Sequence, residues 1–141
     1  MAADSATSAD NLRTGVVDKI FKNSRGDLLG LCGSMALSGQ FAKWFTQLEQ
    51  GEKPALLIKE RELNAMIVRE TGEIEIHEDG GMFLYCRDIP DEYLYYAIGS
   101  GSGIALGAMH AGASAFDAVR AAVHHDIGTG GPIQTLRLGR D

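Results

Sequence analysis

The first candidate for chemistry in this sequence is a glycine- and serine-rich run at residues 99–103 (GSGSG), ahead of an alanine-rich segment. A strand-to-helix junction of this kind can hold a phosphate, because unpaired N–H groups and the helix dipole converge there. A dinucleotide-binding pattern, however, needs a third glycine where Ile104 or Leu106 stands, and no Lys-Ser/Thr pair completes a phosphate loop. Ser100 also lacks the Gly-x-Ser-x-Gly spacing of a serine hydrolase. The run alone predicts close packing of a helix on a sheet.

A second candidate is the sequence His124-His125-Asp126, whose side-chain types are those of metal ligands. Adjacent residues of a helix point in different directions and do not face one another, so they cannot converge on one ion without distant partners. His77 and His110 are isolated in the sequence. We therefore expect no metal site and no cofactor.

A third candidate is the pair Asp4 and Lys19, which we place on neighbouring strands. By residue type alone, such a pair predicts an ordinary surface ion pair, which contributes little to stability. Its interest depends on the elements around it.

Composition limits the class of protein. A chain of 141 residues fits a single domain over residues 1–141. Its net charge of -6 argues against a nucleic-acid or anionic-membrane binder. Two distant cysteines, no apolar run of about 18 residues and no signal-peptide pattern favour a reduced, cytoplasmic protein.

Hydrophobic periodicity predicts an α+β protein, because the helices are grouped and do not alternate one by one with strands. Apolar residues at three- and four-residue steps indicate a helix over 35–50, capped by Ser34 and ended by Gly51. Residues 53–62 read as a short helix or a connection broken near Pro54. Further helices are predicted over 104–111 and 115–126, and strands over 1–7, 14–21, 28–32, 63–69, 73–77, 82–86, 93–98 and 133–138.

Five stretches, taken in their order along the chain, resemble the proteasome β-subunit and HslV family of N-terminal-nucleophile hydrolases. The resemblance is closer to the small phage and bacterial relatives of that family. They are 2–5 (AADS), 17–20 (VDKI), 30–34 (GLCGS), 97–103 (AIGSGSG) and 125–131 (HDIGTGG). The resemblance covers most of the chain. It implies a four-layer αββα sandwich, threonine-type hydrolysis of peptide bonds, and homo-oligomers that include rings.

The resemblance also implies roles for six residues. In the family, an N-terminal threonine attacks the amide carbonyl, and its own α-amine, with a pKa of about 8, takes the proton. Lys19 would stabilise the developing charge, and Asp4 would keep Lys19 ionised. The Gly33 N–H would supply the oxyanion donor. Ser100, Asp126 and Thr129 would form the network around the amine.

One departure from the family concerns the nucleophile. A strand and a turn would place the family's threonine roughly a dozen residues before Asp4, yet three residues precede Asp4 here. We therefore expect a chain that lacks the first strand and is inactive, with Ser5 or Thr7 able to serve only by pulling the strand apart. The segment between the first helix and Leu63 is also shorter than the family's second helix.

Three interpretations follow from this pattern. The first is a peptidase subunit whose start lies upstream. The second is a non-catalytic oligomeric or assembly subunit, and the third is an amidohydrolase of non-peptide substrates on the same fold.

Overall fold

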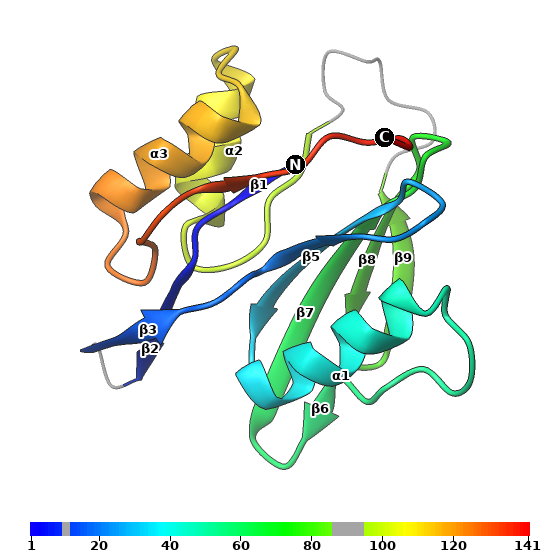
Figure 1. Ribbon diagram of the computed structural model, residues 1–141. Helices are drawn as coiled ribbons and strands as arrows, with labels where there is room; N and C mark the ends of the chain where they lie inside the picture. The colour runs from blue at the N-terminus through cyan, green and yellow to red at the C-terminus, as the bar shows by residue number, and fades with distance from the viewer. Residues whose placement is uncertain (10–11, 86–94) are drawn as a thin grey trace. The chain divides into compact units, whose positions relative to one another are not determined.

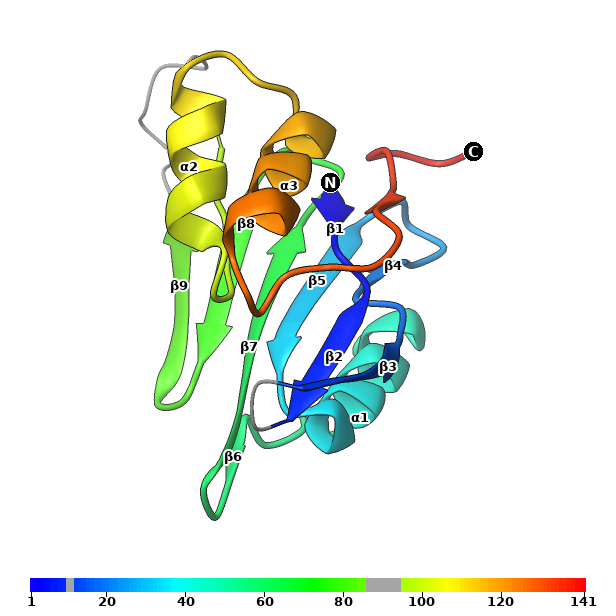
Figure 2. The same ribbon diagram turned by 90° about the vertical axis from the view of Figure 1, so that its left-hand side faces the viewer.

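The computed structural model describes residues 1–9, 12–85 and 95–141, and these divide into two compact units of non-contiguous sequence (Figures 1 and 2). Unit 1 comprises residues 1–20 and 89–135, and unit 2 comprises residues 21–88 and 136–141. In the part of the chain that is described, no helix has the length and apolar character needed to cross a membrane.

Unit 2 is built on a sheet with the strand order β4-β5-β7-β8-β9, in which the pairs β5–β7, β7–β8 and β8–β9 are antiparallel. The short β6 lies off this path and pairs with β7. The strands are β4 (Ile20–Lys22), β5 (Leu28–Gly33), β6 (Leu57–Ile58), β7 (Arg61–Val68), β8 (Ile74–Glu78) and β9 (Gly81–Tyr85). The meander predicted for the middle of the chain is confirmed. The segment 53–62, expected as a short helix or a connection, contains β6 and the first two residues of β7 instead of a helix.

Helix α1 (Met35–Thr46) covers one face of this sheet beside β5 and β7 (Figure 1). Phe41 and Phe45 are fully buried against Leu63 and Ile67, which alternate along β7. Ser34 caps the helix by accepting a hydrogen bond from the Leu37 N–H, as its residue type predicts.

The predicted end of α1 is wrong, because the helix ends at Thr46 and not near Gly51. Leu48 and Glu49 follow in the left-handed region, with φ of 59° and 61°. This conformation costs a non-glycine residue about 1–2 kcal/mol. The Leu48 and Glu49 N–H groups donate to the carbonyls of Phe45 and Trp44 in the last turn of the helix. The contacts of Glu49 are described below.

Unit 1 contains two short antiparallel sheets and two helices. The pairs are β1 (Ala2–Ala3) with β10 (Gln134–Thr135) and β2 (Ala6–Ala9) with β3 (Leu12–Val16). Helices α2 (Ser102–His110) and α3 (Ala115–His125) pack against each other, and α3 also contacts β1 (Figure 2). Ser114 caps α3 through the Asp117 N–H, as predicted.

Four predicted strands of unit 1 differ from the structure. The strand expected over 1–7 is interrupted at Asp4 and Ser5, between β1 and β2. The single strand expected over 14–21 is interrupted at residues 17–19, between β3 and β4. The final strand has two residues instead of the six expected, and residues 95–98 are irregular. The first two residues of the strand expected over 93–98, like Cys86 and the turn residues Asp10 and Asn11, lie outside the described residues.

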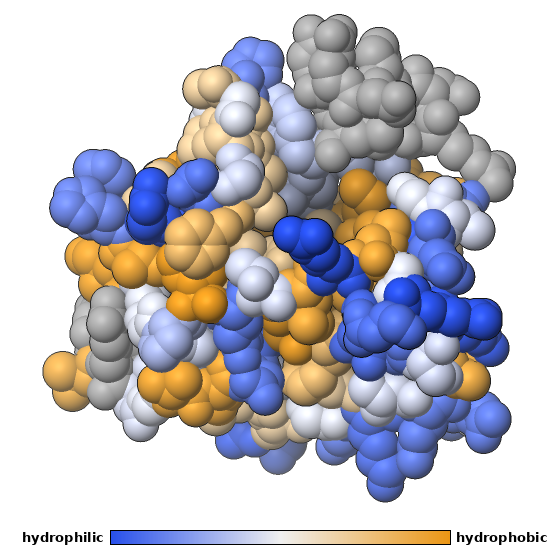
Figure 3. Space-filling model, turned by 45° about the horizontal axis from the view of Figure 1, so that its top comes forward, coloured by the Kyte–Doolittle hydropathy of each residue, from blue (hydrophilic) through white to orange (hydrophobic). Residues whose placement is uncertain are grey.

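The element content confirms the α+β class, with three helices and mostly antiparallel pairing among the described residues. Large apolar side chains are exposed in both units, including Leu12 and Ile127 in unit 1 and Phe83 in unit 2. On the face drawn in Figure 3, hydrophobic residues interrupt the hydrophilic surface at several places.

Candidate functional site

The centre of the candidate site is an ion pair between Asp4 and Lys19 in unit 1. The Lys19 Nζ lies 2.8 Å from Asp4 Oδ1, and the two side chains are 21% and 14% exposed. Asp4 stands between β1 and β2, and Lys19 stands between β3 and β4, so both occupy breaks between strands. The Val17 N–H donates to the Ser5 carbonyl at 2.8 Å and holds the two breaks together.

A loop of unit 1, residues 126–131, fixes the Asp4 carboxylate. The Gly130 N–H donates to Asp4 Oδ2 at 2.9 Å, while the Gly130 carbonyl accepts from the N–H groups of Ser5 and Ala6. Gly131 has a φ of +75°, and a Cβ there would meet Ser5 Oγ at 2.7 Å. The loop therefore approaches the β1–β2 segment closely enough to require glycine at this position.

The same loop carries a second polar group, centred on Asp126. Its Oδ2 accepts hydrogen bonds from Ser100 Oγ at 2.7 Å and from Thr129 Oγ1 at 2.5 Å. Hydrogen bonds from the Thr129 hydroxyl, which has the larger effect, and from the Ser100 hydroxyl hold the pKa of Asp126 below its usual range. Thr129 and Gly130 are consecutive, so successive residues contact the Asp126 group and the Asp4 carboxylate. We call Asp4, Lys19, Ser100, Asp126 and Thr129 the loop site.

Two glycines make the close packing of the Asp126 group possible. A Cβ at Gly101 would lie 2.8 Å from Thr129 Oγ1 and 2.9 Å from Ala122 Cβ. One at Gly128 would lie 2.6 Å from Ser100 Oγ. These distances are shorter than Cβ contacts in real proteins, so side chains at these two positions would displace the hydroxyls from Asp126.

Gly33, the remaining predicted site residue, ends β5 in unit 2. It has a φ of +109°, and a Cβ there would collide with the Glu62 carbonyl oxygen. The backbone at this position therefore requires glycine. Its role as an oxyanion donor stays a prediction.

The two hydroxyls considered as local nucleophiles are both engaged. Ser5 is 1% exposed, and its Oγ donates to the Pro132 carbonyl at 2.6 Å. Thr7 is 7% exposed, and its Oγ1 lies 3.0 Å from Thr14 Oγ1. Either residue would have to leave a buried hydrogen bond before it could attack a substrate.

The histidines considered as metal ligands contact other groups. His110 Nδ1 lies 2.7 Å from the Tyr95 hydroxyl, and the rings of His124 and His125 contact each other edge to face. Within residues 1–9, 12–85 and 95–141, no three His, Cys, Asp or Glu side chains are placed to share a metal ion.

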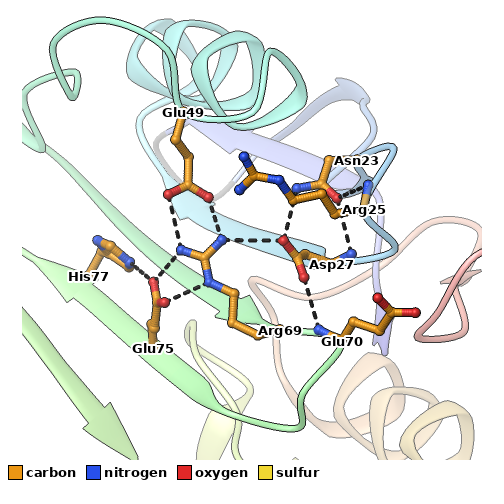
Figure 4. A network of polar contacts seen from close by, with 8 residues as sticks. All are labelled: Asn23, Arg25, Asp27, Glu49, Arg69, Glu70, Glu75 and His77. Atoms are coloured by element: carbon orange, nitrogen blue, oxygen red, sulfur yellow. Dashed lines mark hydrogen bonds and ion pairs between the residues drawn. The ribbon is translucent and has the colours of Figure 1, made fainter.

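Unit 2 holds a separate polar cluster that the sequence did not lead us to expect (Figure 4). Arg69 lies at its centre, with Nε and Nη2 on Glu75, Nη1 and Nη2 on Glu49, and Nη1 at 3.4 Å from Asp27. Asp27 also accepts from the Glu70 N–H and from Asn23. We call Asp27, Glu49, Arg69, Glu75 and His77 the Arg69 cluster.

The pKa values of the Arg69 cluster reflect its closed pairing. Burial opposes ionisation of Glu75, but bonds from His77 and Arg69 outweigh it and lower the pKa of Glu75 to about 2. Burial likewise opposes the charge of Arg69, yet Glu49 and Glu75 raise its pKa above the usual value. Asp27 follows the same pattern, since the Glu70 N–H, Asn23 and Arg69 overcome burial and lower its pKa. His77 Nε2 lies 2.9 Å from Glu75 Oε2, and its buried Nδ1 has no hydrogen-bond partner.

Comparison with known proteins shows a solved structure with a similar fold. No protein-family model and no curated protein sequence matches this chain. Among solved structures, it is similar to Thiobacillus denitrificans BPH, solved alone and in complex with epoxomicin. Each match has a TM-score of 0.61 at 20% identity and covers 94% of this chain and 88% of that one. The two chains share a fold.

The structure brings five of the six predicted site residues into the loop site. Sequence reasoning missed two groups that hold them, the Gly130 N–H on Asp4 and the Gln134 side chain at residues 18–19. Their partners are 126, 115 and 116 residues away in the sequence. No local pattern could have indicated contacts at such separations.

Proposed function

We propose that this chain is a proteasome- and HslV-like subunit of the threonine-type peptidases, which hydrolyse peptide bonds. The observation that carries the proposal is the Asp4–Lys19 ion pair, fixed by the Gly130 N–H next to Thr129 of the Asp126 group. The fold shared with BPH, which binds epoxomicin, supports it. The finer architecture we propose is the αββα sandwich of that family.

In the proposed reaction, an N-terminal threonine hydroxyl attacks the peptide carbonyl carbon, and its proton passes to the threonine α-amine. The Lys19 ammonium stabilises the negative charge that develops on the attacking oxygen, and Asp4 keeps Lys19 charged. The protonated amine then delivers the proton to the leaving nitrogen, which leaves an ester. Water hydrolyses this ester by the same route in reverse, with the Gly33 N–H as the proposed oxyanion donor.

The nucleophile in this proposal comes from residues ahead of Met1 in the native protein. Ser5 and Thr7 are buried and hydrogen-bonded, so neither is suited to attack. Residues 1–141 by themselves are then expected to be inactive. In the active protein, the Asp126 group would bind the α-amine of the N-terminal threonine. We further propose that the protein acts as a homo-oligomer.

The deciding experiment is the intact mass of the native protein, followed by treatment with epoxomicin. We expect a mature N-terminal threonine upstream of Met1 and an epoxomicin adduct mapped to that threonine by peptide mass spectrometry. A form in which that threonine is replaced by alanine is the control and should take up no adduct.

Other outcomes would replace the proposal. A mature native chain that starts at Met1 or Ala2 would contradict it and favour a non-catalytic subunit, for which light scattering should show an oligomer. An N-terminal threonine that cleaves small non-peptide amides but no peptide would favour an amidohydrolase.

A further inference from the structure

The C-terminal strand of unit 1 lies beside both arms of the loop site. β10 pairs with β1 in the register Ala2↔Thr135 and Ala3↔Gln134, and Asp4 directly follows Ala3 in the sequence. The backbone of Gln134 is therefore fixed one residue from the carboxylate that binds Lys19.

The side chain of Gln134 reaches the other arm of the site. Its Oε1 accepts a hydrogen bond from the Lys19 backbone N–H at 3.0 Å, and its Nε2 donates to Asp18 Oδ1. The Gln134 amide thus accepts a hydrogen bond from Lys19 and donates one to Asp18, the residue before it. The first bond holds the N–H of the 18–19 peptide, and the second holds the side chain of Asp18.

The contact matters because Lys19 stands where the chain has left one strand and not yet entered the next. Residues 17–19 separate β3 from β4, so no strand ladder positions them. Lysine also has a flexible four-carbon stem, which makes the place of its ammonium depend on where its backbone is held. The bonds from Val17 to Ser5 and from Lys19 to Gln134 hold that backbone.

We propose that Gln134 is a positioning residue that sets the Lys19 ammonium against Asp4 by binding the Lys19 backbone N–H and the Asp18 side chain. Its importance for catalysis rests on the proposed peptidase function, whereas its effect on the ion pair does not. The test therefore uses one measurement that needs no activity and one that does.

The variants use the fact that Gln134 accepts one of the two hydrogen bonds and donates the other. Gln134→Ala removes both bonds, and Gln134→Glu keeps an acceptor for Lys19 but places a carboxylate against Asp18. Adding Asp18→Asn to Gln134→Glu restores both bonds with the second one reversed, because the new amide donates to the new carboxylate. Thr135→Ala is the matched control, since Thr135 is the exposed neighbour on the same strand.

The first measurement is the rate at which an amine-reactive acylating reagent modifies Lys19 in the folded, full-length native protein, read by peptide mass spectrometry. Lys22 is the internal reference, because it is also paired at 2.8 Å, with Asp141 in unit 2. We expect Gln134→Ala and Gln134→Glu to raise the Lys19 to Lys22 ratio about tenfold, and the double variant to return it to the wild-type value.

The second measurement is peptide hydrolysis by the same proteins. We expect kcat to fall about tenfold in both single variants with KM unchanged, and to recover in the double variant. A merely structural role would instead raise labelling at both lysines and would show no rescue.

The outcomes separate the two proposals. An unchanged Lys19 to Lys22 ratio in Gln134→Ala overturns the positioning role, whether or not the protein cleaves peptides. A raised and rescued ratio in a protein with no peptidase activity confirms the positioning role and overturns the proposed function.

Discussion

The loop site of unit 1 and the Arg69 cluster of unit 2 both join carboxylates to one basic side chain, but they use the charges differently. In the Arg69 cluster, Glu49 and Glu75 each bind the planar guanidinium through two bonds, and Asp27 approaches the same group. In the loop site, Lys19 meets one carboxylate, while the second carboxylate is bound by two hydroxyls, one of them on the exposed Ser100. The first arrangement is closed, and the second has an edge open to solvent.

The difference shows what the shifted pKa values mark in this chain. Strongly shifted pKa values often mark active sites, although structural ion-pair networks shift them too. Here, the Arg69 cluster has the large shifts, because its mutual hydrogen bonds and ion pairs outweigh the opposing effect of burial. It ties the turn before β5, the end of α1 and the β7–β8 hairpin together. One of its carboxylates belongs to Glu49, whose backbone is left-handed.

The largest expected effect is the loss of stability when Arg69 is replaced by methionine, a side chain of similar length. Three carboxylates would then lie close together without a cation, and breaking a buried pair in this way costs about 3–5 kcal/mol. Urea denaturation followed by circular dichroism measures the change. The matched control is Arg120→Met, whose pair with Asp117 is 69% and 45% exposed and should contribute less than about 1 kcal/mol. Equal effects of the two substitutions would show that the Arg69 cluster is not the closed structural unit described above.

A smaller effect is expected from acid, through Glu75. Its folded pKa of about 2 is below the usual 4.5, so the stabilisation is complete above pH 4.5 and is lost as the pH falls from 4.5 towards 2. The loss is on the order of 3 kcal/mol, since each unit of pKa shift corresponds to about 1.4 kcal/mol.

Urea midpoints measured at pH 7, 4.5 and 3 test this prediction. Glu75→Gln should flatten the acid dependence, whereas Glu78→Gln, at the exposed end of the same strand, should leave it intact. A wild-type protein whose midpoint does not move between pH 4.5 and 3 would contradict the assignment.

The sequence predicts features that depend on near neighbours and fails where distant ones decide. Periodicity located α1 and the β7–β8 hairpin, and capping chemistry identified Ser34 and Ser114. The end of α1 was missed because Leu48 and Glu49 adopt a left-handed conformation that their types do not favour, and the Glu49 carboxylate binds Arg69, 20 residues farther on. Similarly, 14–21 reads as one strand, yet long-range bonds to Ser5 and Gln134 take residues 17–19 out of the ladder.

For the loop site, the resemblance supplied the residues, and the contacts supply their grouping. The predicted ion pair between Asp4 and Lys19 is present, but the two residues lie in breaks between strands and not on the neighbouring strands expected. The glycines in the 125–131 stretch were recognised only as a turn, whereas in the structure the Gly130 N–H binds the Asp4 carboxylate directly. A backbone donor carries no side-chain signature, so residue types could not have indicated it.

The smallest of these expected changes in stability comes from Lys19→Met. This substitution is the sharpest test of the difference between the loop site and the Arg69 cluster. One carboxylate loses its cation instead of three, and Asp4 keeps its bond from the Gly130 N–H, so the substitution should cost about 1.5 kcal/mol, the value of one hydrogen bond to a charged group. The same substitution should lower peptide hydrolysis by the native protein about 10²–10³-fold, the usual cost of removing a group that stabilises developing charge. Lys22→Met, which breaks the pair with Asp141, should cost as little stability and leave hydrolysis unchanged. A loss of stability at Lys19 as large as that at Arg69, with no specific effect on hydrolysis, would make the loop site a second structural cluster and remove the distinction between the two regions.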